Sequence, residues 1–442
     1  MGPGTARPEL GTRGVSKVEK SRGTRARAHG RAAPCPERPT PLALTMASET
    51  DKIDTKRYDR QIRLWGLDTQ RGLVGARVLM LGANGLANEI IKNLVLAGVG
   101  HVCIQDTRDV TQADLDTGGL FSVHKTQLGL GMAAALAEQL KPMNPSVEVV
   151  AMRDEVEAID VDRLQTYNFI IGTRGISALR ELATCTAALE QSGTSGDNAE
   201  PDPKRQRGSG ESGPAVAQSN GKHEVVPMRS STPVLPKLFA AGTLGVDGFC
   251  FLDLGAATAI LPLDKKEKCD VSGDGDNPLS VEEEDGPPPA KHKTERALYP
   301  TIESAARVEW AALTPRVPAL YYALQLLADA GQVAKSELLS ALTQARAQRL
   351  STAGPSREGA CAKLLSDAYL SRLVSAHDVE LAPVTAIVGG MIASEVIKII
   401  SGKELPINNA FFFDGDSCDG VVLHLGPSFS LPGGVIDNGK FK

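Results

Sequence analysis

The sequence predicts an α/β protein with a doubly wound sheet, and the strongest of three observations is the pattern of residues 76–106. A short apolar run at residues 76–81, typical of a buried parallel strand, stops at Gly82. A second apolar run, residues 99–105, ends at Asp106, about twenty residues after the turn. Between them the apolar side chains follow a helical period: Leu86, Ile90, Ile91, Leu94 and Val95. Strand, glycine turn, helix and strand in this order predict the βαβ unit of a Rossmann-like fold.

Two further groups of apolar segments extend this unit into a sheet covered by helices. After a polar loop at residues 107–127, the first group predicts a helix at 128–140 and buried strands at 147–152 and 168–171. The second group follows a hairpin expected at 233–255. It comprises helices at residues 315–331, 334–349 and 383–401 and strands at 410–414 and 420–425. Strands that alternate with helices in this way indicate a doubly wound sheet.

The overall composition favours neither nucleic acid nor a membrane as a partner. The chain of 442 residues has a net charge of −5 and only 4% aromatic residues. Its longest apolar helix, at residues 383–401, carries Glu395 and Lys398, which favours a core helix over a membrane span. The seven cysteines include no CxxC pair, which favours reduced thiols in the cytosol or nucleus.

One large α/β domain interrupted by polar inserts accounts best for the length. Residues 51–190, 233–262 and 296–426 are expected to build the fold. The segments 191–232 and 263–295 are low in apolar residues and are expected to be disordered inserts. A basic run at residues 204–207 leaves a nuclear localisation signal open, and residues 427–442 are expected to form a loose tail.

Residues 1–50 are rich in Arg, Pro and Gly and are expected to be a disordered extension. Their arginines leave an organelle transit peptide open. Met46 opens the string MASETDK, a natural start, so the first 45 residues are also open to being an upstream extension without a role.

The glycine turn after the first strand is degenerate. A turn that cradles phosphate follows the pattern GxGxxG, because the second glycine lets backbone N–H groups approach a pyrophosphate. Here Asn84 stands where a glycine is expected, and Ala87 replaces another. We therefore expect Gly82, Gly85 and Asp106 to be the vestige of a nucleotide site.

Five motifs together resemble the ubiquitin-activating enzyme family. They are YDRQIRLWG at residues 58–66, EIIKNL at 89–94 beside the glycine turn, LKPMNP at 140–145, APVTAIVGGMIASEVIKIISG at 382–402 and NNAFFFDG at 408–415. Within that family the chain is most similar to the small, regulatory subunits of heterodimeric enzymes of the SUMO-activating type. The resemblance covers roughly residues 55–190, 233–262 and 296–426. It implies an adenylation, or ThiF-type, fold shared by two pseudo-symmetric subunits.

The resemblance also implies a division of labour between the subunits. The catalytic partner subunit would bind ATP and magnesium, adenylate the C-terminal glycine of the modifier SUMO and transfer it to a cysteine. This chain would bind no cofactor and no metal of its own, because it departs from the catalytic pattern at the matching positions.

Three departures carry that expectation. In the loop after Asp106 an active subunit has an Asn-Arg-Gln group that grips phosphate, and residues 116–119 here (Asp-Thr-Gly-Gly) supply no arginine. After the strand that ends at Ile171 an active subunit has an Asp-Asn pair whose aspartate holds magnesium, and residues 172–174 are Gly-Thr-Arg instead. Cys185, on a predicted helix, is expected to be a buried small hydrophobe rather than a nucleophile.

Arg60 is the one residue for which the resemblance implies a catalytic role. The arginine of the YDRQ motif reaches across the dimer, in trans, to the partner's ATP site. A guanidinium fixed by an aromatic neighbour can neutralise the charge that grows on departing pyrophosphate. The alternative is that Arg60 is an ordinary solvated charge on a surface helix.

The expected function is therefore that of a non-catalytic, regulatory subunit that supports SUMO adenylation by its partner, in the nucleus and cytoplasm. Three alternatives stay open. The regulatory subunit for the cullin-directed modifier is longer and carries a large helical insert, whereas the inserts here are short and polar. An autonomous activating enzyme would need its own metal-binding aspartate and cysteine. A nicotinamide-dependent oxidoreductase would need an intact glycine turn.

Overall fold

The computed structural model describes residues 53–116, 123–193, 235–262, 292–426, 436–437 and 440–441. The predicted extension at residues 1–50, the basic run at 204–207 and most of both predicted inserts lie outside these ranges.

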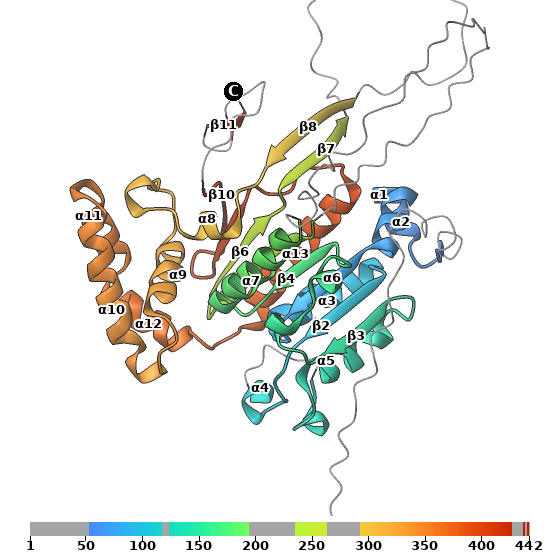
Figure 1. Ribbon diagram of the computed structural model, residues 1–442, viewed down its shortest axis with the longest axis horizontal. Helices are drawn as coiled ribbons and strands as arrows, with labels where there is room; N and C mark the ends of the chain where they lie inside the picture. The colour runs from blue at the N-terminus through green and yellow to red at the C-terminus, as the bar shows by residue number, and fades with distance from the viewer. Residues whose placement is uncertain are drawn as a thin grey trace, which may run out of the picture. The chain divides into compact units, whose positions relative to one another are not determined.

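An eight-stranded sheet forms the centre of the described chain, in the order β10-β9-β6-β5-β4-β1-β2-β3 (Figure 1). Its strands are β1 (Arg77–Leu81), β2 (His101–Gln105), β3 (Glu148–Met152), β4 (Phe169–Gly172), β5 (Lys237–Leu244), β6 (Asp247–Asp253), β9 (Ala410–Asp414) and β10 (Asp419–Leu423). The five strands from β3 to β5 pair in parallel, and β5, β6, β9 and β10 pair antiparallel. The predicted α/β fold with a doubly wound sheet and the hairpin at 233–255 are confirmed.

The strand order reverses at β1, which lies between β2 and β4. Met80 pairs with Ile104 on one side and with Ile171 on the other. In open α/β sheets, ligands bind beyond the carboxyl ends of the strands at such a point. The place to look for a site is therefore the crevice just after Leu81 and Gly172.

Helices cover both faces of the sheet. They are α1 (Asp59–Trp65), α2 (Leu67–Gly75), α3 (Gly85–Ala97), α4 (Gln112–Asp116), α5 (Met132–Leu140), α6 (Val161–Leu164), α7 (Ile176–Gly193), α8 (Ile302–Ala306), α9 (Ala319–Ala330), α10 (Lys335–Thr352), α11 (Pro355–Leu364), α12 (Asp367–Ala376) and α13 (Ala382–Ser401). Val78 and Met80 belong to the core cluster that includes residues of α3, α5 and α13, whereas Leu79 and Leu81 belong to the cluster that includes residues of α7, α9 and α10. The alternation of side chains along β1 thus divides the apolar core into two layers.

Helix α13 is long and apolar enough to cross a membrane by length and composition. In the fold it packs along α3 and against β6 (Figure 1). A Cβ on Gly389 would lie 2.8 Å from the Cβ of Glu89, so this glycine lets α13 approach α3 rather than the sheet. Nothing lies within 4 Å of a Cβ on the neighbouring Gly390.

Some element boundaries differ from the prediction. The loop expected at 107–127 contains α4 and a 3₁₀ turn at Lys125–Gln127, and the following helix begins only at Met132. Helices α11 and α12 were not predicted. A separate hairpin pairs β7 (Ala256–Pro262) with β8 (His292–Leu298), and β8 begins inside the run 263–295 that was expected to be disordered. Two short strands, β11 (Ile436–Asp437) and β12 (Lys440–Phe441), pair within the predicted tail.

Candidate functional site

The degenerate glycine turn lies in the crevice between β1 and β4, where the strand order reverses. Gly82 has φ of +105°, and a Cβ there would lie 2.8 Å from the hydroxyl of Thr173, so only glycine fits. Asn84 is the N-cap of α3: its Oδ1 accepts from the N–H of Ala87 at 2.9 Å, and its Nδ2 donates to the carbonyl of Thr173 at 2.9 Å. The residue that breaks the glycine pattern therefore ties the turn to the end of β4.

The backbone N–H groups that would face a phosphate in a nucleotide-binding turn are bonded to side chains of this chain. The N–H of Gly85 donates to Oε2 of Glu380 at 2.7 Å, and the N–H of Leu86 donates to Oε1 at 3.4 Å. The N–H of Ala83 donates to Oδ2 of Asp106 at 2.9 Å. A helix N-terminus is a natural anion site, because its free N–H groups and its dipole favour negative charge. The carboxylate of Glu380 fills that site.

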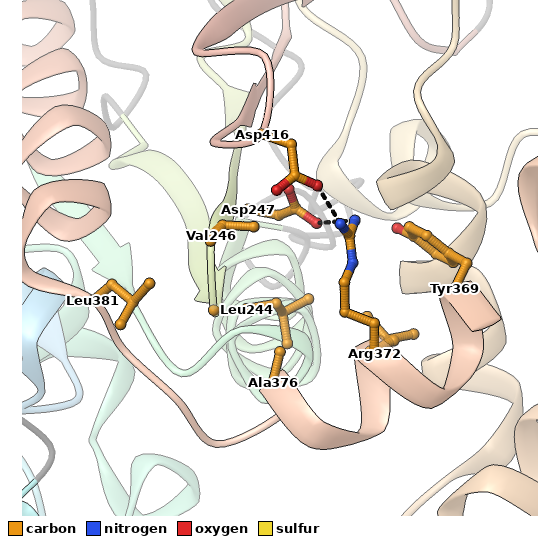
Figure 2. Close-up of a pocket in the computed structure, with 10 residues that line it drawn as sticks. Leu244, Val246, Asp247, Tyr369, Arg372, Ala376, Leu381 and Asp416 are labelled. Atoms are coloured by element: carbon orange, nitrogen blue, oxygen red, sulfur yellow. Dashed lines mark hydrogen bonds and ion pairs between the residues drawn. The ribbon is translucent and has the colours of Figure 1, made fainter.

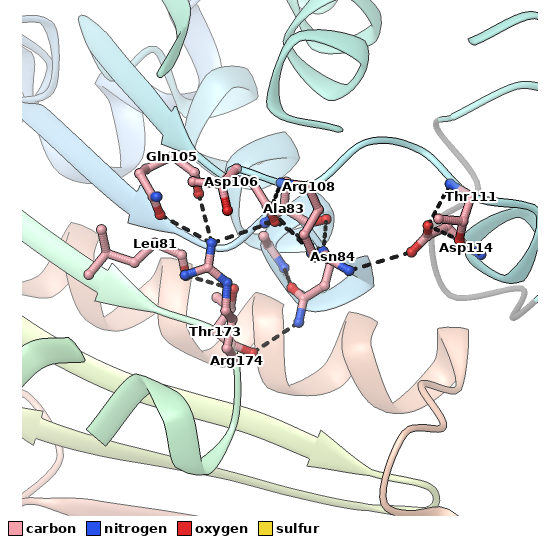
Figure 3. A network of polar contacts seen from close by, with 12 residues as sticks. Leu81, Ala83, Asn84, Gln105, Asp106, Arg108, Thr111, Asp114, Thr173 and Arg174 are labelled. Atoms are coloured by element: carbon pink, nitrogen blue, oxygen red, sulfur yellow. Dashed lines mark hydrogen bonds and ion pairs between the residues drawn. The ribbon is translucent and has the colours of Figure 1, made fainter. Parts of the chain in front are cut away.

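Asp106, the position that would bind ribose, is fully buried and held by two arginines (Figure 3). Its carboxylate accepts from Nε and Nη2 of Arg108 at 3.1 and 3.0 Å, and Nη2 of Arg174 lies 3.6 Å away. Burial opposes ionisation, but the hydrogen bonds and positive charge of Arg108, with help from Arg174, hold the pKa of Asp106 below its ordinary value. Asp106 therefore acts as an internal counter-ion.

Arg174 belongs to the Gly-Thr-Arg run that stands in place of the Asp-Asn pair implied by the resemblance. Its Nη1 donates to Glu181 at 2.8 Å, and its Nη2 donates to the side chain and the carbonyl of Gln105 at 3.1 and 3.3 Å. A fixed cation at this position would repel a metal ion. Among the described residues no group of three or more His, Cys, Asp or Glu side chains could hold a metal.

The predicted trio of Gly82, Gly85 and Asp106 thus does come together in one crevice. The sequence did not predict which side chains fill this crevice. Arg108 lies at the start of the loop after Asp106, but its side chain folds back and donates to the Asp106 carboxylate. Glu380 is 295 residues from Gly85 along the chain, and no local pattern connects the two.

Cys185 lies buried on α7, as predicted. Burial raises its pKa to about 12, with smaller contributions from Glu181 and Glu157. Because the thiolate is the nucleophilic form, a thiol with this pKa is a poor nucleophile at neutral pH.

The YDRQ motif lies at the opposite end of α3. Tyr58 is buried, and its hydroxyl accepts a hydrogen bond of 2.8 Å from Nδ2 of Asn144, which also donates to the carbonyl of Val95. A Cβ on Gly98 would lie 2.7 Å from the Tyr58 ring, so the glycine that ends α3 also makes room for the tyrosine. Two of the five motifs, at 58–66 and 140–145, are thereby joined in one anchor for α1.

Arg60 lies two residues after this anchor, on the exposed face of α1. Its helical neighbour Arg63 pairs with Asp59 at 3.1 Å, and Arg57 pairs with Asp54 at 3.8 Å. Arg60 itself makes no hydrogen bond or ion pair with any residue that the structure describes. Because Tyr58 fixes the backbone of α1 and the Arg60 guanidinium has no partner among the described residues, Arg60 is able to contact another molecule.

Arg60 is too far away to serve this chain's own crevice. Helix α3 has 13 residues, which makes it about 20 Å long. The anchor of Tyr58 contacts its C-terminal end, whereas Gly82 and Gly85 lie at its N-terminal end. An arginine side chain cannot span that length, so Arg60 cannot act on a ligand in this chain's own crevice.

Tyr58→Phe tests the anchor. The substitution should lower the free energy of unfolding by about 1–2 kcal/mol, because one buried N–H of Asn144 loses its acceptor. Urea unfolding of the purified chain measures this. Tyr369→Phe is the matched control, since the buried hydroxyl of Tyr369 has no hydrogen-bond partner in the described part of the chain. Equal effects of the two substitutions would contradict the anchor.

Known proteins with a related sequence match most of the length of this chain. The chain is 28% identical over 396 residues to SUMO-activating enzyme subunit 1 of Homo sapiens, covering 85% of this chain and 96% of that protein. It is 29% identical over 391 residues to the protein of the same name from Danio rerio, covering 84% and 94%. The resemblance found in the motifs is thus confirmed.

A crystal structure of E. coli MccB with MccA-N7isoASN matches at a TM-score of 0.43 and 12% identity, over 86% of this chain and 74% of that one.

The sequence model of the ThiF family matches residues 58–421, from Tyr58 of the YDRQ motif to the middle of β10. This match spans both the degenerate turn and the anchored arginine. The chain therefore belongs to the ThiF family.

Proposed function

We propose that this chain is the non-catalytic, regulatory subunit of a heterodimeric SUMO-activating enzyme. It supports the ATP-dependent adenylation of the SUMO C-terminus by a catalytic partner subunit. The observation that carries the proposal is Arg60: it is exposed, without a partner among the described residues, and fixed about 20 Å from this chain's own crevice. The choice of SUMO as the modifier rests on the relatives named SUMO-activating enzyme subunit 1.

In the proposed reaction, the carboxylate of the SUMO C-terminal glycine attacks the α-phosphorus of ATP in the partner's site. A bond forms between the carboxylate oxygen and phosphorus, and the bond to the bridging oxygen breaks, which gives acyl adenylate and pyrophosphate. Arg60 donates to the departing pyrophosphate and neutralises the charge that grows on it. Tyr58 and Asn144 hold the helix that presents Arg60.

The chain's own crevice takes no part in that reaction. Nucleotide phosphate would have to displace the carboxylate of Glu380 from the N–H groups of Gly85 and Leu86. Ribose would have to displace Arg108 from Asp106. Both exchanges cost hydrogen bonds that the fold already makes. We therefore infer that this chain binds neither ATP nor magnesium, and that both lie in the partner subunit.

The surface around Arg60 suits a partner subunit. Leu64 is exposed on α1, Leu67 at the start of α2 and Leu96 at the end of α3, where Tyr58 anchors α1. Exposed apolar side chains next to a functional charge are typical of an interface. The partner we propose is the catalytic subunit, with the complex acting in the nucleus and cytoplasm.

Affinity purification of the full chain followed by identification of its stoichiometric partner tests this assignment. We expect a single partner that carries an intact GxGxxG turn and a catalytic cysteine. ATP–pyrophosphate exchange should depend on SUMO and on both subunits. Exchange by this chain alone would show that it is an autonomous activating enzyme and would refute the proposal.

A further inference from the structure

A cavity of about 180 Å³ lies at the turn between β5 and β6, on the other side of the segment that carries Glu380 (Figure 2). Helix α12, the residue Leu381 before α13 and the turn between β9 and β10 complete its walls. Its apolar lining comes from Leu244, Val246, Leu373, Ala376 and Leu381. One water takes about 30 Å³ of liquid volume, so the cavity has room for a side chain of several carbons.

Two glycines build the walls by close approach. Gly245 has φ of +62°, and a Cβ there would lie 2.8 Å from the Cβ of Ala376. Its N–H donates to the carbonyl of Val379 at 2.9 Å, which fixes the hairpin turn to the segment after α12. A Cβ on Gly415 would lie 2.4 Å from the carbonyl oxygen of Val246. Close contacts among the β5–β6 turn, the end of α12 and the β9–β10 turn therefore fix the walls of the cavity.

The polar side of the cavity has more negative than positive charge. Asp247 and Asp416 line it, and Asp414 lies close enough to act on Asp247, whereas Arg372 is the cation that they share. Arg372 pairs with Asp416 through Nη1, and its Nη2 lies 3.7 Å from Asp247 (Figure 2). Two carboxylates facing one guanidinium, with Asp414 near Asp247, leave an excess of negative charge on this side.

Asp247 is the carboxylate that lacks a close counter-ion. It is 7% exposed, and its ion pair with Arg372 is long. Burial raises the pKa of Asp247 to about 6, and the charges of Asp414 and Asp416 add to the effect against the opposing influence of Arg372. At pH 7.5 the group is mainly ionised, and a second cation beside it would be favourable.

The position of Arg372 indicates which cation fits. Its guanidinium lies over the ring of Tyr369, 5.3 Å from the centroid, and so occupies the flat aromatic face. A second guanidinium would find no stacking surface there, whereas a compact ammonium needs only a carboxylate and an apolar wall for its stem.

We propose that this cavity binds the side chain of a lysine presented by a partner protein. The four-carbon stem lies on Leu244, Leu373 and Ala376, and the ammonium group lies beside the carboxylate of Asp247, on the side away from Arg372. The site takes an alkylammonium group from an exposed segment and is separate from the adenylation chemistry.

The test is a ligand-observed NMR titration of the full chain at pH 7.5 with three blocked tripeptides, acetyl-Gly-X-Gly-amide. X is lysine, norleucine or arginine. Norleucine has the apolar stem without the charge. We expect the lysine peptide to bind at least about tenfold more tightly than either of the others, because only it supplies both stem and compact charge.

Two protein variants and one control complete the experiment. Asp247→Asn should weaken the lysine peptide about tenfold, and Ala376→Leu, which fills the cavity, should weaken it as much. Asp419→Asn removes the same charge from an exposed aspartate outside the cavity and should change nothing. Because folding already disfavours the ionised form of Asp247, Asp247→Asn should remain folded, and its thermal unfolding checks this. Equal binding of lysine and norleucine, equal or tighter binding of arginine, or equal binding by Asp247→Asn and Asp419→Asn would overturn the proposal.

Discussion

Arg60→Ala is expected to lower ATP–pyrophosphate exchange by the assembled enzyme by about a thousandfold while leaving assembly intact. In the mechanism we propose, the guanidinium acts on charge that exists only as pyrophosphate departs, and arginines supplied in trans to phosphoryl sites contribute about 10³ or more in rate. Assembly should survive, because an exposed side chain with no partner among the described residues contributes nothing to the fold of α1. The measurement is exchange at saturating SUMO with both subunits present, together with size-exclusion chromatography of the complex.

Arg63→Ala is the matched control for this substitution. Arg63 lies one turn further along the same helix, is exposed, and pairs with Asp59. It carries the same charge on the same element, so any effect of general electrostatic attraction would appear in both variants. We expect less than a threefold change for Arg63→Ala. Unchanged exchange in Arg60→Ala would remove Arg60 from the mechanism, and equal losses in both variants would reduce its role to long-range attraction.

The parts of the structure that could be predicted are those set by local pattern. The βαβ unit at residues 76–106 has one short apolar strand, one helical period and one more strand, and each became an element within two residues of its expected bounds. Cys185 was placed correctly because it sits at a buried position of a predicted helix. Patterns of period 2 and 3.6 carry this information within a window of ten to twenty residues.

Helix α11 was missed because its own sequence has only a weak helical pattern. Helix α11 (Pro355–Leu364) has Gly359 in its middle and few apolar residues, so its pattern has no clear helical period. It buries Cys361 against the helices next to it in the chain. Tertiary packing, rather than the pattern of α11 itself, decides that it is a helix.

The state of the nucleotide crevice could be predicted only in part. The change at Asn84 showed that the glycine pattern is broken, and Gly-Thr-Arg at residues 172–174 showed that the metal-binding aspartate is missing. Neither shows what replaces the ligand. The replacement by Glu380 depends on a contact 295 residues away, and a single sequence holds no signal for a pairing of that kind.

Asp106→Asn is expected to destabilise the chain by about 2–3 kcal/mol. The carboxylate is fully buried and accepts from the N–H of Ala83, from the N–H of Arg108 and from the Arg108 guanidinium. Breaking a buried pair by removing one partner costs about 3–5 kcal/mol, and we expect less here because half of the Arg108 side chain is exposed and Arg174 keeps Glu181. Equilibrium urea unfolding measures the change, with Asp109→Asn, which removes a surface ion pair with Arg153, as a control expected to lose less than about 1 kcal/mol.

The pH dependence of this difference separates an internal counter-ion from a ribose ligand. Because the folded-state pKa of Asp106 lies below the ordinary 3.8, its carboxylate stabilises the fold at pH values above 3.8, and that contribution is lost as the pH falls through the lowered pKa. The gap between the original chain and Asp106→Asn should therefore be constant from pH 5 to pH 8 and shrink at lower pH. Exchange activity per folded complex should stay unchanged if, as we propose, the crevice of this chain binds no nucleotide. A loss of exchange without a loss of stability would mean that Asp106 meets ATP after all.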